Sequence, residues 1–96
     1  MRTPESWEKK DVDDYLESVG AYIVKPTSGG FGVSGHADRV VCIKGMFFSL
    51  EVKREGKGPT PIQQRRMEEV EVAGGFAVAG TAEVVLAYIK TALAES

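Results

Sequence analysis

The chain has 96 residues, of which 43% are hydrophobic and 27% charged, and its formal net charge is −2 at pH 7. This composition is typical of a single soluble globular domain over residues 1–96, and its slight acidity lowers the expectation of non-specific binding to nucleic acid. Because no apolar run approaches the roughly 20 residues of a membrane helix and the N-terminus lacks a signal-peptide core, we expect no membrane partner and a cytoplasmic location.

The first part of the chain is predicted to form a helix, a short strand and a glycine-rich loop. Apolar residues recur at helical spacing from Glu5 to Val19, and Gly20 is a typical residue for ending such a helix. A strand over residues 21–24 follows, and then a loop over residues 27–35. This loop spells G-x-G-x-x-G, but a strand and not a helix comes after it, so we expect no dinucleotide fingerprint and no nucleotide cofactor.

A β-hairpin is predicted next, because two β-rich runs flank a Lys-Gly turn at residues 44–45. Side chains alternate along a strand, so Glu51 and Lys53 share one face of the second run. In an antiparallel hairpin, Asp38 at the start of the first run comes close to both of them. Cys42 is the only cysteine, which excludes an internal disulfide, and we expect it to be a small buried hydrophobic residue.

The last part of the chain is predicted to contain a helix, a strand and a final helix. Thr60 followed by proline is a typical helix start, and this helix is expected to run to about Ala73, before two glycines. Residues 76–79 are predicted to form a strand, and Thr81 to begin the final helix. The order αβββαβα predicts an α/β or α+β fold with a mixed sheet flanked by helices.

Asp38, Glu51 and Lys53 together are suited to metal-assisted cleavage of phosphodiester bonds. Mg²⁺ binds through one or two carboxylates plus phosphate oxygens of the substrate. An ammonium beside them can orient or deprotonate the attacking water and can stabilise developing negative charge. The alternative is an ordinary ion pair on an exposed strand face, with Asp38 merely opening a strand.

Two further residues allow both a structural and a functional interpretation. Glu8 lies on the apolar stripe of the first helix, so it points towards the sheet, where a cation at the hairpin would compensate a half-buried carboxylate. Alternatively, Glu8 is a favourable acid near a helix N-terminus, and Glu5 competes for the metal-linked role. Gln63 fits a capping box with Thr60, but its spacing also turns it towards the sheet, where it could support the site.

The order of these motifs resembles the VRR-NUC domain (virus-type replication-repair nuclease), a branch of the PD-(D/E)xK nuclease superfamily with a restriction-endonuclease-like core. The resemblance runs roughly from Glu5 to Leu93. The motifs that carry it are, in chain order, Glu8, Gly35-His36-Ala37-Asp38, Glu51-Val52-Lys53 and Thr60-Pro61-Ile62-Gln63. Ala37 is a departure, because the name of the superfamily leads one to expect proline before the aspartate.

The resemblance implies a deoxyribonuclease that depends on one or two Mg²⁺ or Mn²⁺ ions and leaves a 5′-phosphate and a 3′-hydroxyl. The metal ligands that it implies are Glu8, Asp38, Glu51 and the Val52 carbonyl, and Lys53 and Gln63 complete the catalytic group. Stand-alone members, of viral or bacterial type, are similar in size to this chain. The resemblance implies that they act as homodimers on branched DNA such as four-way (Holliday) junctions, since paired sites in a two-fold dimer can cut symmetric strands.

Basic residues are concentrated in the middle of the chain. From Lys25 to Arg66, eight basic residues stand against three acidic ones, a net charge of +5, while the two flanks together carry −7. This polarity predicts a phosphate-facing surface. The residues expected to contact DNA are Lys25, Ser28, Gly29, Gly30, Arg54, Lys57 and Arg66.

Two other functions remain open at this point. One is a non-catalytic DNA-binding or assembly subunit that keeps the fold, although the presence of all three hairpin residues argues against it. The other is a nuclease of the same fold that acts on RNA or on simple DNA ends.

Overall fold

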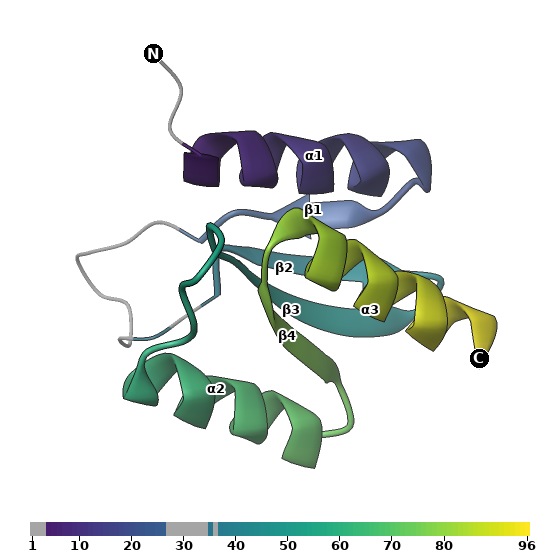
Figure 1. Ribbon diagram of the computed structural model, residues 1–96. Coiled ribbons are helices and arrows are strands. Elements are labelled where there is room, and N and C mark those ends of the chain that lie inside the picture. The colour runs from purple at the N-terminus through teal and green to yellow at the C-terminus, as the bar shows by residue number, and fades with distance from the viewer. Residues whose placement is uncertain (1–3, 27–34, 36) are drawn as a thin grey trace.

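The structure, a computed structural model, describes residues 4–26, 35 and 37–96, which form a four-stranded sheet flanked by helices (Figure 1). The elements in chain order are α1 (Pro4–Ser18), β1 (Tyr22–Val24), β2 (Arg39–Ile43), β3 (Met46–Val52), α2 (Pro61–Val72), β4 (Phe76–Gly80) and α3 (Ala82–Ala94). The predicted αβββαβα order is thereby confirmed. Within the described residues, no helix is long and apolar enough to cross a membrane.

The sheet is mixed, with the strand order β1-β2-β3-β4. Strands β1 and β2 and strands β2 and β3 pair antiparallel, whereas β3 and β4 pair parallel. The predicted hairpin turn is present: Ile43 pairs with Met46, and Lys44 and Gly45 between them have φ angles of 51° and 80°. Positive φ at both central residues matches the twist of the flanking strands, which is why a Lys-Gly turn closes this hairpin in two residues.

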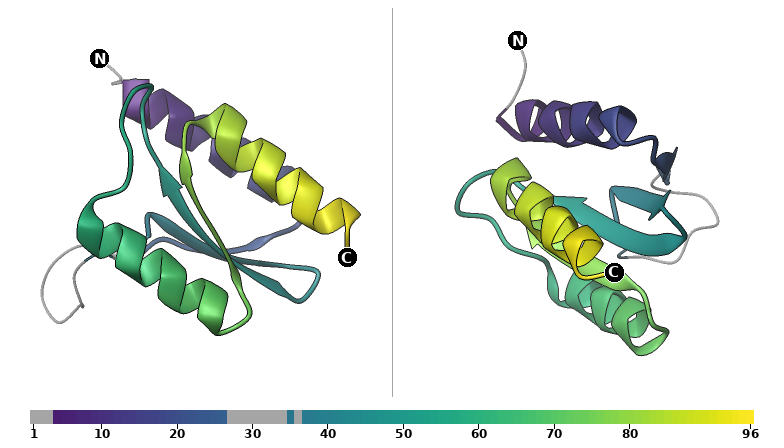
Figure 2. Two further views of the ribbon diagram at one scale, coloured as in Figure 1. Left: turned by 60° about the horizontal axis from the view of Figure 1, so that its bottom comes forward. Right: turned by 90° about the vertical axis from the view of Figure 1, so that its right-hand side faces the viewer.

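The three helices form two layers around the sheet. Helices α1 and α3 contact each other on one face of the sheet, and α2 lies across the sheet from them (Figures 1 and 2). Strand alternation directs one set of β3 side chains into the α1–α3 layer, and the side chains with no exposed surface there are Val12, Leu16, Phe48, Leu50, Val52, Val85 and Ile89. This single apolar cluster fixes both helices against β3. It thereby positions the residues at the ends of that strand.

The helix ends follow the sequence signals. Gly20 has a φ of 71°, the left-handed conformation that ends α1. The Thr60 hydroxyl accepts a hydrogen bond from the Gln63 N–H at the start of α2, and the Thr81 hydroxyl accepts one from the Val84 N–H at the start of α3. Both threonine caps were predicted.

The expectation that Cys42 is buried is wrong, because its side chain is exposed. The strand register places Tyr22, Cys42 and Phe47 side by side on the face opposite the core, and Tyr22 is 72% and Phe47 46% exposed. Helix α2 covers this face over β4, not over β1. An apolar strand residue is buried only where a second layer covers it, so the part of this face that α2 leaves uncovered keeps apolar side chains at the surface.

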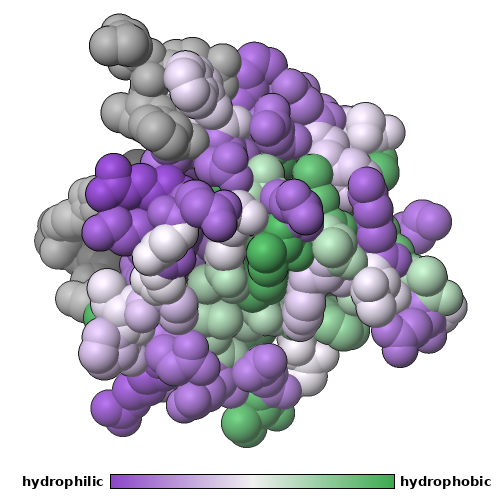
Figure 3. All heavy atoms as spheres, in the orientation of Figure 1, coloured by the Kyte–Doolittle hydropathy of each residue, from purple (hydrophilic) through white to green (hydrophobic). Residues whose placement is uncertain are grey.

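Apolar side chains also reach the surface on the side of the molecule drawn in Figure 3. They form a band across the middle of that view, over β4 and α3, between polar residues of α1 and of α2. Val84 on α3 is 50% exposed and Val72 at the end of α2 is 89% exposed. On this face, the polar surface is therefore formed by α1 and α2 on the two sides of the apolar band.

A charged cluster joins α1 to the start of β2. Arg39 donates from Nε to Asp13 Oδ1 at 2.7 Å and from Nη2 to Asp13 Oδ2 at 3.0 Å, and Lys25 Nζ lies 3.1 Å from Asp13 Oδ2. Arg39 Nη1 also donates to the Asp38 carbonyl at 3.0 Å. Burial alone would raise the pKa of Asp13, but the hydrogen bonds and charges of Arg39 and Lys25 outweigh it, and the pKa lies below the usual 3.8. The cluster therefore holds the backbone just before β2.

Asp13→Asn is expected to lower the free energy of unfolding by about 2 kcal/mol at neutral pH, as is typical when a hydrogen-bonded charge is lost. Because the pKa of Asp13 is lowered in the folded state, this stability is present above the usual value of 3.8 and is lost as the pH falls through the folded value. Urea unfolding should therefore show a difference between wild type and variant that shrinks below pH 3.8. Asp14→Asn is the control, because Asp14 pairs only with exposed Lys10 and should matter by less than about 0.5 kcal/mol. Equal losses in both variants would contradict this role of Asp13.

Candidate active site

The hairpin brings Asp38 and Glu51 into direct contact. Asp38 immediately precedes β2, and Glu51 lies near the end of β3, where Arg39 pairs with Leu50. The Asp38 N–H donates to Glu51 Oε2 at 3.2 Å, and the Val52 N–H donates to Asp38 Oδ2 at 3.0 Å. Each carboxylate is thus held by a backbone amide of the other strand. The sequence predicted this proximity from the position of the turn.

Glu51 is a buried carboxylate, with 5% of its surface exposed. Its second oxygen, Oε1, accepts a hydrogen bond from Gln63 Nε2 at 3.0 Å and lies 3.5 Å from Lys53 Nζ. Burial raises the pKa of Glu51, the charge of Asp38 raises it further, and Lys53 and the Asp38 N–H only partly offset these effects. The positive groups around Glu51 therefore do not fully compensate the negative charge of its ionised carboxylate.

Gln63 fulfils both of the roles that the sequence left open. Its Oε1 accepts from the Thr60 N–H at 2.9 Å, which completes the capping box at the start of α2. Its Nε2 donates to Glu51 at 3.0 Å. Only one orientation of the amide satisfies a backbone donor on one side and a carboxylate on the other, so the cap also fixes which end of Gln63 meets Glu51.

The loop before Asp38 approaches the start of α2 closely. Gly35 has a φ of 86°, and a Cβ added there would lie 2.9 Å from both the side chain and the carbonyl oxygen of Ile62. A larger residue would meet backbone that cannot move without moving α2. Gly35 therefore has a packing role against the start of α2.

Glu8 is engaged at a different place from the one expected. Its Oε1 accepts a hydrogen bond from the Ala82 N–H at 2.7 Å. The first amides of α3 have no partners within the helix and carry its positive dipole end, so a carboxylate from α1 is stabilised there. Glu8 thus joins α1 to α3. The described residues contain no group of three His, Cys, Asp or Glu side chains placed to hold an ion, so a metal-linked role of Glu8 beside Asp38 and Glu51 stays a prediction.

Lys9 is a site residue that the sequence reasoning missed. Its Nζ lies 3.7 Å from Asp38 Oδ1 and 3.4 Å from Glu5 Oε2. The spacing of Glu5 and Lys9, four residues apart on a predicted helix, was the signal available for this pair. Of the two glutamates that competed for a role on α1, Glu5 is therefore the one connected to Asp38, through Lys9.

The basic residues expected to contact DNA differ in their surroundings. Lys25 is paired with Asp13, and Arg66 Nη1 donates to both carboxylate oxygens of Glu69, at 2.8 and 2.9 Å. Arg54 is exposed and directly follows Lys53. The other candidates are Lys57, which is exposed, and Ser28, Gly29 and Gly30, which lie outside the described residues.

The oxygen atoms at this site suit a hard divalent cation. Asp38 and Glu51 supply only oxygen donors, as would the Val52 carbonyl that the sequence predicts as a ligand. Mg²⁺ binds through one or two carboxylates and completes its shell with water and phosphate oxygens. The buried charge of Glu51 beside that of Asp38 also calls for a further positive charge. The residues present therefore fit Mg²⁺ or Mn²⁺.

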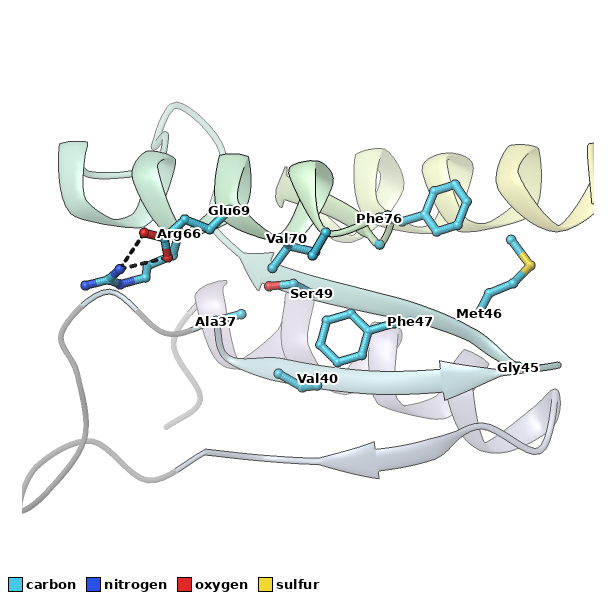
Figure 4. Close-up of a pocket in the computed structure, with 13 residues that line it drawn as sticks. Ala37, Val40, Gly45, Met46, Phe47, Ser49, Arg66, Glu69, Val70 and Phe76 are labelled. Carbon is cyan, nitrogen blue, oxygen red and sulfur yellow. Dashed lines mark hydrogen bonds and ion pairs between the residues drawn. The ribbon is translucent and has the colours of Figure 1, made fainter.

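A cavity in the described residues lies beside this site and not around it. It measures about 760 Å³ and lies between α2 and the sheet, with Val40, Phe47, Val70 and Phe76 among its lining side chains (Figure 4). Arg66 and Glu69 face each other at one end, and Asp38, Glu51 and Lys53 do not line it. The acidic site is thus separate from this cavity and lies at the end of the β2–β3 hairpin opposite its turn.

Comparison with solved structures finds a similarity over almost the whole chain. A structure described as a VRR_NUC domain superposes on this chain with a TM-score of 0.79 and 28% sequence identity, over 93% of this chain and 97% of the other. No protein-family model matches the sequence, and no curated protein matches it significantly. The similarity therefore concerns the whole domain and not one motif.

Proposed function

This chain is a VRR-NUC domain, and we propose on that premise that it is a metal-dependent endonuclease that hydrolyses DNA phosphodiester bonds. The observation that carries the proposal is the contact between Asp38 and Glu51. The Asp38 N–H donates to the Glu51 carboxylate, and the Val52 N–H donates to the Asp38 carboxylate. Lys53 lies beside Glu51. A structural ion pair alone would not require a buried carboxylate next to a second one.

Asp38, Glu51 and the Val52 carbonyl would hold one or two Mg²⁺ or Mn²⁺ ions. When bound, the ion would polarise the scissile phosphate and make the attacking water more acidic. Gln63 holds the Glu51 carboxylate in place through its hydrogen bond. We assign the Lys53 ammonium, 3.5 Å from Glu51 Oε1, the role of orienting water and stabilising negative charge on phosphate oxygens.

In the reaction itself, the oxygen of water bonds to phosphorus and the bond from phosphorus to the 3′ oxygen breaks. The leaving 3′ oxygen takes up a proton. The products are therefore a 5′-phosphate and a 3′-hydroxyl. Lys53, 16% exposed at its side chain, is the described cation nearest to the Glu51 carboxylate and is our candidate for stabilising the transition state.

Branched DNA and a homodimer are the finer parts of the proposal. The acidic site is at an end of the sheet, and exposed Arg54 and Lys57 follow Lys53 in the chain, which suits a phosphate backbone running past the site. Exposed Tyr22 and Phe47 give the sheet an apolar face that a second copy could cover. Two sites in a two-fold dimer would match the symmetry of a four-way junction.

A substrate panel tests the proposed function. The purified protein is incubated with Mg²⁺ and a labelled four-way junction, a flap, a duplex and a single-stranded RNA. We expect cleavage of the junction, which a chelator abolishes. A preparation from cells that lack the gene controls for contaminating nucleases. Absence of cleavage on every substrate, together with absence of Mn²⁺ binding in calorimetry, would leave a non-catalytic DNA-binding or assembly subunit.

A further inference from the structure

The ammonium of Lys9 lies between two carboxylates at the edge of the acidic site. It is 3.7 Å from Asp38 Oδ1 and 3.4 Å from Glu5 Oε2. The Lys9 side chain is 30% exposed and that of Asp38 23% exposed, so the pair is half-buried and only partly screened by water. Lys9 thus places a positive charge next to a residue proposed to bind a cation.

The two oxygens of Asp38 have different surroundings. Oδ2 accepts a hydrogen bond from the Val52 N–H at 3.0 Å and is thereby fixed to β3. Oδ1 faces Lys9 at 3.7 Å, a separation that is an ion pair and not a short hydrogen bond. Oδ2 is thus held by a backbone amide, and Oδ1 is the oxygen at which an incoming cation would meet the charge of Lys9.

The charges around the site explain why a counter-ion is needed. Asp38 contacts Glu51 through its backbone amide, and the charge of Asp38 raises the pKa of Glu51. Lys53 faces Glu51 on one side, and Lys9 faces Asp38 on the other. Each carboxylate of the site therefore has its own lysine. Glu5, four residues before Lys9 on α1, offers the Lys9 ammonium a second partner.

We propose that Lys9 is a positioning residue that acts as an internal counter-ion of Asp38 and competes with the divalent cation for it. In the metal-free protein, Lys9 offsets the charge of Asp38 beside the buried carboxylate of Glu51. When a cation binds, the ammonium withdraws towards Glu5, four residues away on the same helix. This inference rests on the proposed metal site at Asp38, and it adds that the chain itself limits the affinity of that site.

Calorimetric titration with Mn²⁺ tests this competition directly. Lys9→Met removes the charge and keeps the length of the side chain. It should bind Mn²⁺ about fivefold more tightly than wild type, which corresponds to roughly 1 kcal/mol for a partly exposed ion pair. Lys9→Arg keeps the charge and should bind like wild type.

Lys10→Met is the matched control. Lys10 is the next residue of α1 and forms its own i,i+4 pair with Asp14 at 2.7 Å, exposed and separate from the site. Its loss should leave Mn²⁺ affinity unchanged. A merely structural role of Lys9 would lower stability or weaken binding, but would not strengthen it.

The outcomes separate the two proposals. Mn²⁺ affinity of Lys9→Met equal to or weaker than that of wild type overturns the role of Lys9 and leaves the nuclease proposal intact. Absence of Mn²⁺ binding in wild type and in both Lys9 variants overturns the metal site and with it the competition. Tighter binding in Lys9→Met without cleavage of any substrate supports the counter-ion and refutes the nuclease.

Discussion

Glu51→Gln is expected to lower the rate of DNA cleavage by about a thousandfold, measured as single-turnover cleavage of the preferred substrate with Mg²⁺. The carboxylate of Glu51 is the buried half of the proposed metal site, and loss of the ion removes several kcal/mol of charge stabilisation from the transition state. The same variant should lose the rise in stability that Mn²⁺ gives the wild type, about 2.7 kcal/mol at a hundredfold excess over the dissociation constant.

Without metal, Glu51→Gln should change the free energy of unfolding by less than about 1 kcal/mol, because two effects oppose each other. A neutral side chain avoids the burial of charge that raises the pKa of Glu51. However, the Asp38 N–H and the Gln63 amide both donate to the carboxylate, and glutamine offers only one carbonyl oxygen to them. Glu55→Gln, at an exposed carboxyl in the following loop, is the control and should retain cleavage. Cleavage by Glu51→Gln at the wild-type rate would refute the assignment.

The parts of the fold that were predictable depend on local chemistry. The two-residue turn has positive φ at both positions, and a glycine-containing pair between apolar runs indicates such a turn whatever the rest of the chain does. Thr60 and Thr81 cap helices by bonds to residues three positions later. Once the turn at residues 44–45 was placed, strand geometry alone brought Asp38 next to Glu51. These signals act within a few residues or across one hairpin.

The errors concern contacts between elements that are distant in the chain. Period-two alternation shows which side chains of a strand share a face, but not whether a helix covers that face, and Cys42 lies on the uncovered part. Likewise, helical periodicity turned Glu8 inward without showing that the start of α3 lies opposite it. Lys9 was overlooked because it lies next to the predicted inward stripe, and only the docking of α1 brings it to Asp38.

Gln63 illustrates a third case, in which two interpretations were treated as alternatives but are compatible. An amide side chain has an acceptor end and a donor end. The capping box uses the oxygen of Gln63, and Glu51 uses its nitrogen. The cap at the start of α2 therefore transmits its geometry to the buried carboxylate. A residue that caps a helix with one side-chain atom can thus contact the site with its other polar atom.

Lys53→Ala is expected to lower the cleavage rate by about a hundredfold or more while Mn²⁺ binding is retained, because the ammonium acts on the charge that develops in the transition state and is not a metal ligand. Lys53 lies 3.5 Å from Glu51 and lowers its pKa, so its removal lets that pKa rise further. The loss of Mn²⁺ binding on acidification should therefore begin at a higher pH in the variant. Single-turnover cleavage and calorimetry across a pH series measure both effects.

The neighbour Arg54 provides the control for Lys53. Arg54 is exposed, so Arg54→Ala should weaken DNA binding in a salt-dependent way and leave both the maximal cleavage rate and the pH dependence of Mn²⁺ binding unchanged. Loss of Mn²⁺ binding together with cleavage in Lys53→Ala would show that the lysine holds the site together instead of acting on the substrate. Cleavage at the wild-type rate by Lys53→Ala would show that Lys53 takes no part in the mechanism. The two lysines beside Asp38 and Glu51 would then only compensate the charges of these carboxylates.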